Sequence, residues 1–487
     1  MQPWLSHPFD DDKLKEECGV FGVNGVADAA NFVALGLHAL QHRGQEAGGI
    51  ITHDPLNGFN SAHRFGLVRD NFTSAKLMET LPGSIGLGHV RYSTAGSKGA
   101  TAIRDVQPFF GEFSMGGAAI AHNGNITNAA AIRRELIDRG SIFQSSSDSE
   151  CIIHLMARSI QKTIAERLKD ALRRVEGAFS IVAMTRTKLI GVRDGLGVRP
   201  LVLGRLGEGW ALASETCALD IIGAEYVREI EPGEMVVIDA KGNVTSSRPF
   251  DRAQSRFCIF EHVYFSRPDS ILGGRSVYET RRQIGVELAR EAPVEADLVC
   301  PVPDSGTPAA IGFSQESGIP YAMGIVRNQY MGRTFIEPSE QIRNMGVRLK
   351  LNVNRALVRD KRIVLVDDSV VRGTTSLKIK EMILEAGAKE VHFRIASPPT
   401  MWPCFYGVDT PERSKLLAAR MSEEEMREFI GVESLKFISL NGLYRAAGEA
   451  EGRNKSCPQF CDACFSGDYP VVPSDMIERG FVLKAAE

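Results

Sequence analysis

Short apolar runs separated by glycine-bearing turns fill residues 18 to 247 of the chain. Alternation of apolar and polar positions with a period of two is typical of β-strands. Val33, Leu37 and Leu40 form an apolar stripe that predicts a helix ending by Gly44. The pattern therefore predicts antiparallel sheet with interspersed helices. The strand-like runs are CGVFGV, IGLGHVRYST, AAIAHNGN, FSIVAMTRTKLIGVRDG, LVLGRLGEGWALASE and EMVVIDAKGNVTS.

Beyond a boundary near residue 252, the pattern changes to strand–loop–helix units. Residues 297–302 form a short apolar strand, a polar loop follows, and Pro308 stands where a first helical residue is expected. The unit recurs at Ile363–Val366, followed by a loop and a helical stripe that ends at Gly387. Such units predict a parallel sheet with ligands at the carboxyl ends of its strands. The predicted domains are residues 18–252 and 253–487.

Composition limits the classes of protein that remain. A length of 487 residues predicts two large domains or about three smaller ones. The net charge of −3 and the 43% hydrophobic content exclude a disordered chain and a strongly basic nucleic-acid binder. No run reaches the ~18 apolar residues of a spanning helix, and the acidic start lacks an export signal. Nine cysteines are too dilute for a disulfide scaffold, which favours a reducing compartment, so we expect a cytoplasmic protein. From the near-neutral charge and the missing apolar run, we expect neither nucleic-acid nor membrane partners.

Cys18 is a candidate nucleophile because it begins a predicted strand directly after a polar leader, residues 1–17. If this leader were a removable propeptide, the freed α-amine, with a reference pKa of about 7.7–8.0, could take the thiol proton through a water. The alternative is an inert core cysteine after a frayed tail. Four further motifs favour the first interpretation. They are His42–Glu46 (HRGQE), Gly88–Thr94 (GHVRYST), His122–Asn125 (HNGN) and Ser147–Glu150 (SDSE).

Together with CGVFG at Cys18, these motifs resemble the glutaminase domain of the N-terminal-nucleophile (Ntn) amidotransferases, an αββα sandwich. The resemblance implies that Cys18 attacks the side-chain amide of glutamine. Arg91 would then bind the α-carboxylate in a fork-like pair, and Asp148 the ammonium group. The Asn123 side-chain amide and the Gly124 N–H would form the oxyanion hole. Singly, these residues fit a surface charge, a helix cap and a hairpin turn; together they form a complete set for hydrolysing an amino-acid amide.

A second motif, IVLVDDSVVRGTT, covers Ile363–Thr375 and combines a strand, an acidic pair and a glycine-bearing loop. Adjacent carboxylates can bind ribose hydroxyls and hydrated Mg²⁺, and N–H groups at a helix start can hold a phosphate. The alternative is an acidic turn with an ordinary helix cap. The motif resembles the phosphoribosyl-diphosphate (PRPP) loop of type I phosphoribosyltransferases. The substrate-binding residues that this resemblance implies are Asp367, Asp368, Ser369, Arg372, Gly373, Thr374 and Thr375.

The tetrapeptide Asp304–Thr307 follows the earlier strand, where the same family has its diphosphate-binding turn. By this resemblance, Ser305 joins Asp367 and Asp368 around one Mg²⁺ per subunit. Residues 327–350 are rich in Arg and Gly, and they match a flexible loop that closes over PRPP; the alternative is a solvated charge run. Closure would matter because water would compete with ammonia at the activated ribose carbon.

A C-x₂-C pair, Cys461 and Cys464, lies near the end of the chain and by itself suggests zinc, an iron–sulfur cluster or a redox pair. RFCIFEHVYF at Cys258 and the terminal CDACFSGDYP resemble the iron–sulfur branch of the glutamine phosphoribosyldiphosphate amidotransferases. In that branch a [4Fe–4S] cluster connects the two domains, and we expect a structural or oxygen-sensing role for it. The implied ligands are Cys258, Cys404, Cys461 and Cys464, with Cys457 as an alternative terminal ligand. We interpret Cys151, Cys217 and Cys300 as core residues.

The resemblance to this family extends from Cys18 to about Pro470. It implies that ammonia released from glutamine displaces diphosphate from C1 of PRPP, giving 5-phosphoribosylamine in the first committed step of de novo purine synthesis. Family members are commonly homotetramers inhibited by purine nucleotides. Another amidotransferase, such as asparagine synthetase or glucosamine-phosphate synthase, would lack the PRPP loop. A catalytically silent PRPP-binding regulator would need vestigial glutaminase residues, yet all of them are present.

Overall fold

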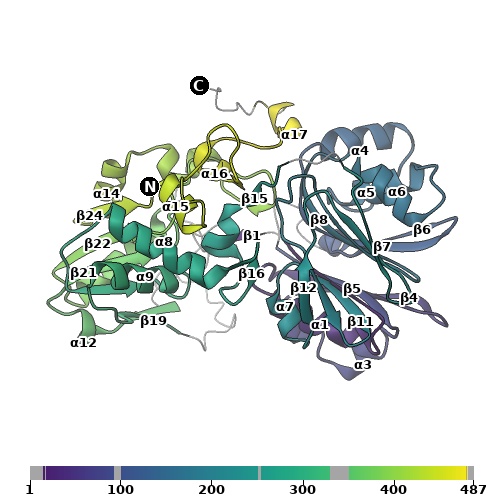
Figure 1. Ribbon diagram of the computed structural model, residues 1–487, viewed down its shortest axis with the longest axis horizontal. Helices are drawn as coiled ribbons and strands as arrows, with labels where there is room; N and C mark the ends of the chain where they lie inside the picture. The colour runs from purple at the N-terminus through teal and green to yellow at the C-terminus, as the bar shows by residue number, and fades with distance from the viewer. Residues whose placement is uncertain are drawn as a thin grey trace.

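The structure is a computed structural model that describes residues 15–16, 18–92, 100–250, 254–328, 350–478 and 480. The N-terminal half forms one lobe and the C-terminal half the other (Figure 1). Most of the predicted leader, residues 329–349 of the predicted PRPP-closing loop (327–350) and the predicted boundary at 252 lie outside the described residues. Among the described residues, no helix is long and apolar enough to cross a membrane.

The first lobe contains two antiparallel sheets. The seven-stranded sheet has the order β12-β10-β11-β2-β5-β3-β4, and the six-stranded sheet has the order β14-β13-β9-β8-β7-β6. The strands of the first sheet are β2 (Cys18–Asn24), β3 (Ala47–Asp54), β4 (Gly58–Phe65), β5 (Ile85–Arg91), β10 (Val202–Leu206), β11 (Gly209–Ala213) and β12 (Glu225–Glu229). Those of the second are β6 (Phe109–Phe113), β7 (Gly116–Ile126), β8 (Gly177–Thr185), β9 (Leu189–Arg193), β13 (Met235–Ile238) and β14 (Val244–Ser247).

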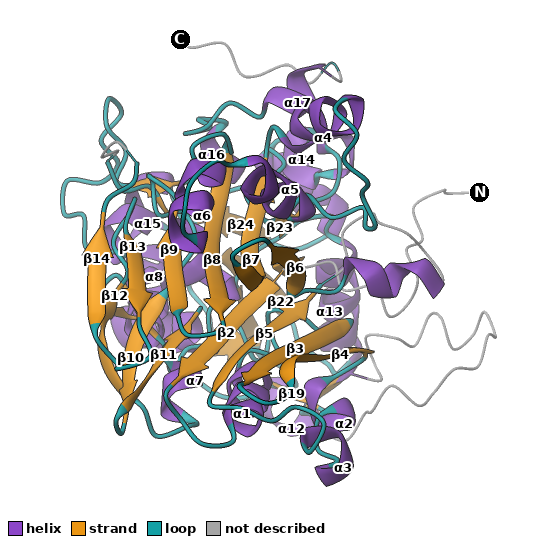
Figure 2. Ribbon diagram, turned by 90° about the vertical axis from the view of Figure 1, so that its right-hand side faces the viewer, coloured by secondary structure: helices purple, strands orange, loops and turns teal. Residues whose placement is uncertain are grey.

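The two sheets are stacked face to face, as Figure 2 shows. Val20 and Leu87 of one sheet share an apolar core with Ala121 and Val182 of the other. Helices α1 (Ala29–Ala39) and α7 (Cys217–Asp220) cover the first sheet, and α4 (Ala129–Asp138), α5 (Glu150–Arg158) and α6 (Ile164–Leu172) cover the second. The short helices α2 (Val68–Asn71), α3 (Ala75–Met78) and η1 (Ala100–Asp105) complete the lobe. The predicted αββα architecture is therefore confirmed.

The second lobe is built on a four-stranded parallel sheet in the order β18-β21-β22-β24. Its strands are β18 (Leu298–Pro301), β21 (Arg362–Asp367), β22 (Glu390–Ile395) and β24 (Ser434–Phe437). Helices α8 (Val277–Glu291) and α9 (Thr307–Ser317) cover one face, and α13 (Thr374–Glu385) and α14 (Glu423–Ile430) the other. Because both faces are covered, even His392 and Arg394 of β22 are buried. The predicted parallel α/β domain is confirmed.

Shorter elements connect the lobes and surround the parallel sheet. The strands are β1 (Lys15–Glu16), β15 (Phe257–Cys258), β16 (Ile271–Leu272), β17 (Arg275–Ser276), β19 (Ile325–Arg327), β20 (Leu351–Val353), β23 (Val408–Asp409) and β25 (Phe460–Cys461). The helices are η2 (Glu261–Phe265, a π-helix turn), α12 (Arg355–Val358), η3 (Arg413–Lys415), η4 (Leu417–Ala419), α15 (Leu440–Ala446), α16 (Ala463–Ser466) and α17 (Ser474–Glu478).

The C-terminal segment returns to the first lobe, where α17 lies beside α4 in both views (Figures 1 and 2). The Asp475 carboxylate accepts hydrogen bonds from the N–H groups of Ala130 (2.6 Å) and Ala131 (3.2 Å), at the start of α4. Arg134 forms an ion pair with Glu478 at 2.7 Å. Helix α17, the last helix among the described residues, thus supplies the N-terminal cap of a helix in the first lobe.

Candidate active sites

The first candidate site lies at one end of the seven-stranded sheet. Cys18 is the first residue of its central strand β2 and lies directly opposite Arg91, the last residue of β5. Cys18 is 8% exposed. A Cβ atom on Gly44 would lie 2.6 Å from the Arg91 backbone, so the HRGQE turn packs against the same strand end. The candidate nucleophile and the candidate carboxylate-binding arginine are therefore neighbours across one antiparallel pair.

Asn123 and Gly124 lie within strand β7 of the other sheet, so the hairpin-turn alternative is wrong. Asn123 is fully buried, and neither its Oδ1 nor its Nδ2 has a hydrogen-bond partner among the described residues. A buried amide without partners is rare and costly, which points to a ligand that completes it. Gly124 has φ +141°, and a Cβ there would lie 2.0 Å from the Ala178 carbonyl oxygen. Only glycine fits at this position.

Asp148 precedes helix α5 but does not cap it, so the helix-cap alternative is also wrong. Its Oδ2 accepts a hydrogen bond from the backbone N–H of Ile126, the last residue of β7, at 2.9 Å. Ser149, beside it, lies with its Oγ 2.8 Å from Nδ1 of His122. Asp148 is thereby fixed to the strand that carries Asn123, as a residue of the same site requires.

Two buried histidines connect the two sheets behind this site. Nε2 of His89, on β5, lies 3.2 Å from the carbonyl oxygen of His122, on β7. Burial, with a smaller contribution from the Arg91 charge, lowers the pKa of His89 to about 3, and burial also lowers the pKa of His122. Both imidazoles are therefore neutral near pH 7.

Replacing His89 by Gln is expected to make the first lobe less sensitive to acid. The pKa of His89 is about 3 in the folded chain and about 6.5 when unfolded, so the unfolded chain binds the proton first. Stability is then lost as the pH falls from about 6.5 toward 3. Between pH 7 and 5 the variant should lose about 2 kcal/mol less than the wild type in urea unfolding. The exposed His38→Gln serves as the control, and equal losses in wild type and H89Q would contradict the assignment.

The second candidate site lies at the carboxyl edge of the parallel sheet, where the loops after β18 and β21 meet. Asp367 and Asp368 are 2% and 1% exposed. Ser305 Oγ donates to Asp368 Oδ1 at 2.5 Å, Ser369 Oγ donates to Asp368 Oδ2 at 2.7 Å, and the Asp368 N–H donates to Asp367 Oδ1 at 2.9 Å. The structure thus brings together the three residues predicted to surround Mg²⁺. Carboxylate and hydroxyl oxygens fit this ion, which also keeps water and substrate phosphate ligands.

The phosphate-binding part of the predicted PRPP loop begins α13. Gly373 is the N-cap residue with φ +79°, and a Cβ there would lie 2.8 Å from Leu417. The N–H groups that begin this twelve-residue helix include those of Thr374 and Thr375, and Arg372 is half-buried beside them. Such a helix start suits an anion.

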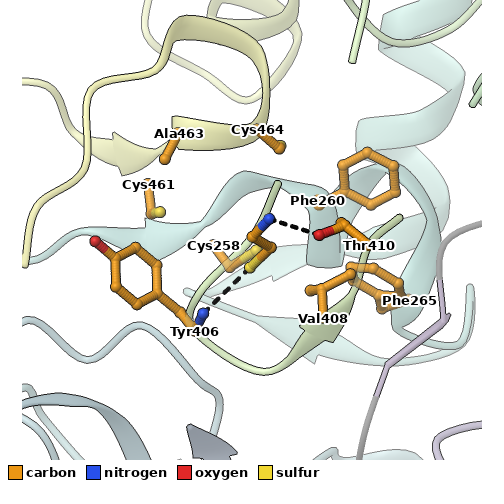
Figure 3. Close-up of a pocket in the computed structure, with 10 residues that line it drawn as sticks. Cys258, Phe260, Phe265, Tyr406, Val408, Thr410, Cys461, Ala463 and Cys464 are labelled. Atoms are coloured by element: carbon orange, nitrogen blue, oxygen red, sulfur yellow. Dashed lines mark hydrogen bonds between the residues drawn. The ribbon is translucent and has the colours of Figure 1, made fainter. Parts of the chain in front are cut away.

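The four predicted cluster ligands, Cys258, Cys404, Cys461 and Cys464, line one cavity, with Phe260, Phe265 and Tyr406 among its walls (Figure 3). Parallel pairing of β15 and β25 places Cys258 beside Cys461. Burial raises the pKa of Cys258 to about 12 and those of Cys461 and Cys464 well above their usual range. Cys457 is exposed and does not line the cavity, whereas Cys151, Cys217 and Cys300 are buried core residues, as predicted.

No three His, Cys, Asp or Glu side chains within the described ranges are placed to hold a single metal ion. A [4Fe–4S] cluster has a different requirement, because each of its four irons takes one thiolate. Four thiols around one apolar cavity fit that requirement. Burial in this cavity favours the neutral thiols, so thiolates here would need a bound cationic group to compensate their charge.

One segment that the sequence analysis did not single out connects all three sites. It begins at the second site, where the Ala396 N–H donates to the Asp367 carbonyl oxygen at 2.8 Å. It then passes Cys404 at the cavity and reaches the first site, where Asn125 Nδ2 donates to the Phe405 carbonyl oxygen at 2.9 Å. A Cβ on Gly407 would lie 2.9 Å from Cα of Gly124, so the two backbones are in contact. Only Cys404 gave a sequence signal for this connection.

An antiparallel sandwich with a cysteine at the start of its central strand, joined to a parallel sheet with an acidic pair at its carboxyl edge, defines a glutamine amidotransferase joined to a phosphoribosyltransferase domain. A family model described as a glutamine amidotransferase domain matches residues 95–220. The amidophosphoribosyltransferase of Rhizobium etli is 55% identical over 468 residues, which are 95% of this chain and 93% of that protein. The chain belongs to the amidophosphoribosyltransferase family.

Other relatives agree. The Bacillus subtilis amidophosphoribosyltransferase is 46% identical over 459 residues, 94% of each chain. The solved structure of the B. subtilis glutamine PRPP amidotransferase with ADP and GMP is 44% identical and matches with a TM-score of 0.87 over 93% of this chain and 97% of that one. A structure described as the allosteric regulatory enzyme of purine biosynthesis matches at 44% identity with a TM-score of 0.88, over 93% and 96% of the two chains. The predicted enzyme class, a glutamine-dependent transferase of purine biosynthesis, is confirmed.

Proposed function

We propose that this chain converts glutamine, PRPP and water into 5-phosphoribosylamine, glutamate and diphosphate, with the residue roles given below. The observation that carries the proposal is the pairing of Cys18 with Arg91 at the strand end. The facing sheet offers the buried amide of Asn123, which has no hydrogen-bond partner in the part of the chain that the structure describes. Beyond family membership, the connected second site supports a shared reaction, because one segment runs from Asp367 to the Gly124 backbone.

At the first site, the α-amine freed at Cys18 takes the thiol proton through a water, and the resulting thiolate attacks the amide carbon of glutamine. The same proton then passes to the nitrogen that leaves as ammonia when the C–N bond breaks. Arg91 binds the substrate carboxylate and Asp148 its ammonium group. The Asn123 Nδ2 and the Gly124 N–H donate to the oxyanion that forms in the tetrahedral intermediate. Water then attacks the resulting thioester, which releases glutamate and restores the thiol. Arg91 is partly buried, and its Nη2 lies 3.7 Å from Asp105 Oδ2. A lysine here would lack the planar fork that binds a carboxylate through two parallel hydrogen bonds.

At the second site, Asp367 and Asp368 bind the ribose hydroxyls, and the loop from Ser369 to Thr375 holds the 5-phosphate at the start of α13. Mg²⁺ held by the acidic pair and Ser305 would neutralise the diphosphate as it leaves. Ammonia forms the new C–N bond at C1 while the C1–O bond to diphosphate breaks. Exclusion of water from this position prevents hydrolysis of PRPP.

The test follows the nitrogen atom. Glutamine labelled with ¹⁵N in its amide is incubated with PRPP, Mg²⁺ and the full chain, and glutamate, diphosphate and labelled product are measured together. We expect equal amounts of glutamate and diphosphate, and a product that keeps the label when unlabelled ammonium is added at a comparable concentration. Glutamate release without diphosphate release, at saturating PRPP, would contradict the proposed function.

We also propose that residues 1–17 are a propeptide, because only a chain beginning at Cys18 offers an α-amine to take the thiol proton. Lys15 and Glu16 of this leader pair with Asp409 and Val408 of β23, in the segment that carries Cys404. Intact-mass measurement of the purified enzyme is expected to show a chain that starts at Cys18. Full glutaminase activity in a chain that retains Met1 would contradict this mechanism.

The cysteine-lined cavity is proposed to hold a [4Fe–4S] cluster bound by Cys258, Cys404, Cys461 and Cys464. Protein purified without oxygen is expected to be brown, with about four irons and four sulfides per chain. Cys404→Ser should lose this colour, whereas Cys457→Ser should keep it because Cys457 is exposed and outside the cavity. Stoichiometric zinc without iron or sulfide would contradict the assignment.

Purine nucleotides are proposed as inhibitors, supported by the relative solved with ADP and GMP. A homotetramer, in which each subunit holds one Mg²⁺ and one cluster, remains a prediction from the family resemblance.

A further inference from the structure

The two lobes meet at a group of buried charged side chains that the reaction scheme does not use. Glu261 of the second lobe lies among Arg43, Arg199 and Glu215 of the first, and all four side chains are fully buried. Buried charges are costly to remove from water, and a buried ion pair adds little net stability compared with apolar packing. The main effect of such a group is therefore on the orientation of the residues that it holds.

Glu261 is the carboxylate that both arginines share. Its Oε2 accepts from Arg43 Nη2 at 2.7 Å, and its Oε1 accepts from Arg199 Nη1 at 3.0 Å. Ser266 Oγ donates to Oε2 at 2.6 Å. Charge-assisted hydrogen bonds of this kind restrict side-chain orientation strongly. Any shift of Glu261 would therefore move both arginines.

Arg43 connects Glu261 to the strand end that carries the nucleophile. Its Nε donates to Glu215 at 2.6 Å, and its Cδ lies 3.3 Å from the position that a Cβ of Gly19 would take. Gly19 is the residue after Cys18, and Gly44, the residue after Arg43, packs against the backbone of Arg91. Arg43 therefore contacts the residue that follows Cys18, and the residue that follows Arg43 contacts the backbone of Arg91.

Arg199 connects Glu261 to the other wall of the site. Its Nε donates to the carbonyl oxygen of Tyr406 at 2.8 Å, directly before Gly407, which packs on Gly124. Its own carbonyl oxygen accepts from Ser180 Oγ at 2.9 Å. Ser180 is the residue paired with Asn123 across β7 and β8. The second arm thus fixes the strand segment proposed to form the oxyanion hole from two directions.

We propose that Glu261 is a positioning residue for the glutaminase site. This carboxylate of the phosphoribosyltransferase lobe holds the strand end at Cys18 through Arg43, and it holds the strand segment of Asn123 and Gly124 through Arg199. The inference rests on the proposed function and adds that the first site is complete only when the second lobe is docked. Glu261 touches no substrate atom in this scheme. Its effect is on the distance between the Cys18 strand end and the strand segment of Asn123 and Gly124.

The second site does not depend on the Glu261 carboxylate. The turn that carries Glu261 is held separately by Arg281 of α8, which donates to the carbonyl oxygens of His262 (2.9 Å) and Ser266 (2.7 Å). These bonds use backbone acceptors, so a change of the Glu261 side chain leaves them intact. The acidic pair lies on β21, which has its own neighbours in the parallel sheet. Loss of Glu261 should therefore separate the two activities.

The test uses the full-length enzyme with Glu261→Gln, which keeps the shape of the side chain and removes its charge. We expect kcat for glutamine hydrolysis to fall at least tenfold, with KM for glutamine changed less than threefold. Ammonia-dependent diphosphate release from PRPP, measured on the same preparation, should stay within twofold of wild type. Alkylation of Cys18 by iodoacetamide, which needs the thiol but no oxyanion hole, should also stay within twofold.

Arg199→Lys is the second variant, because it keeps the charge beside Glu261 and so protects folding, but it lacks the fork that reaches both Glu261 and the Tyr406 carbonyl. It should show the same selective fall in kcat, and it decides the question if E261Q is insoluble. The control is Glu291→Gln, a carboxylate within the second lobe that accepts from Arg445 at 2.7 Å; both activities should be unchanged.

Equal loss of the glutamine and ammonia reactions in R199K and E261Q would overturn the inference, since it would mean general unfolding. Unchanged glutamine hydrolysis in both variants would overturn it as well, while leaving the proposed function intact. A wild-type enzyme that hydrolyses no glutamine would instead refute the proposed function, and the inference with it.

Discussion

Replacing Cys18 by Ala is expected to lower glutamine-dependent diphosphate release from PRPP by at least about 10³-fold, because loss of a nucleophile removes the covalent route altogether. Ammonium chloride at high pH should restore diphosphate release to within about twofold of the wild-type ammonia rate. The physical reason is that the second site lies on a separate parallel sheet and needs only ammonia from the first. The assay measures diphosphate with glutamine or ammonium as the nitrogen donor.

Cys151→Ala is the matched control for this variant. Cys151 is also buried in the first lobe, and burial raises the pKa of its thiol to about 12, so it is a poor nucleophile at neutral pH. This change should affect both nitrogen donors equally and by less than about threefold, through packing alone. If C18A were inactive with ammonia as well, the two sites would not be separable and the two-site scheme would need revision.

The double change Asp367→Asn and Asp368→Asn should impair the second site and spare the first, which is the opposite of the effect expected for C18A. Both carboxylates are buried at the carboxyl edge of β21, and their replacement removes the charges that would bind the ribose hydroxyls and Mg²⁺. We expect diphosphate release to fall by about 10²- to 10³-fold with either nitrogen donor, a loss of about 3–4 kcal/mol of transition-state stabilisation. Glutamine hydrolysis at Cys18 should persist, measured as glutamate release.

Asp297→Asn is the control for the acidic pair. This carboxylate precedes β18 at the opposite edge of the same sheet, where hydrogen bonds from Arg362 lower its pKa to about 2. It carries a charge on the same sheet but lies away from the carboxyl ends of the strands. Its replacement should leave both activities unchanged. A double variant at 367 and 368 that retained normal ammonia-dependent activity at limiting Mg²⁺ would refute the assignment of the second site.

Most of the fold could be predicted from the sequence because its strands are either alternating or continuously apolar. The elements that escaped prediction have weak patterns. Strand β4, GFNSAHRF, is mostly polar and only partly buried at the edge of its sheet, and β24 has four residues. The helix predicted to end by Gly44 ends at Ala39, and Arg43, beyond its end, lies at the lobe interface.

The residues of both candidate sites could also be predicted, since each lies within a short motif whose chemistry is local. The residues that join the sites could not. Glu261 resembles any charged residue of a helix, and Gly407 resembles any loop glycine. Their roles arise from contacts with Arg43, Arg199 and Gly124, far away along the chain, and no local pattern records such contacts. That the Asn123 amide lacks a hydrogen-bond partner among the described residues was likewise visible only in the fold.

The cap that Asp475 provides for α4 has a consequence for the order of events during synthesis. Domains generally fold from the N-terminus as the chain leaves the ribosome. The first lobe would emerge with α4 uncapped, and without Glu261 or Gly407 against its strands. The Glu261 and Gly407 contacts form only after those parts of the second lobe have been made, and the Asp475 cap forms last. On the proposed role of Glu261, we expect a nascent or truncated chain to hydrolyse little glutamine before the lobe that consumes the ammonia has folded.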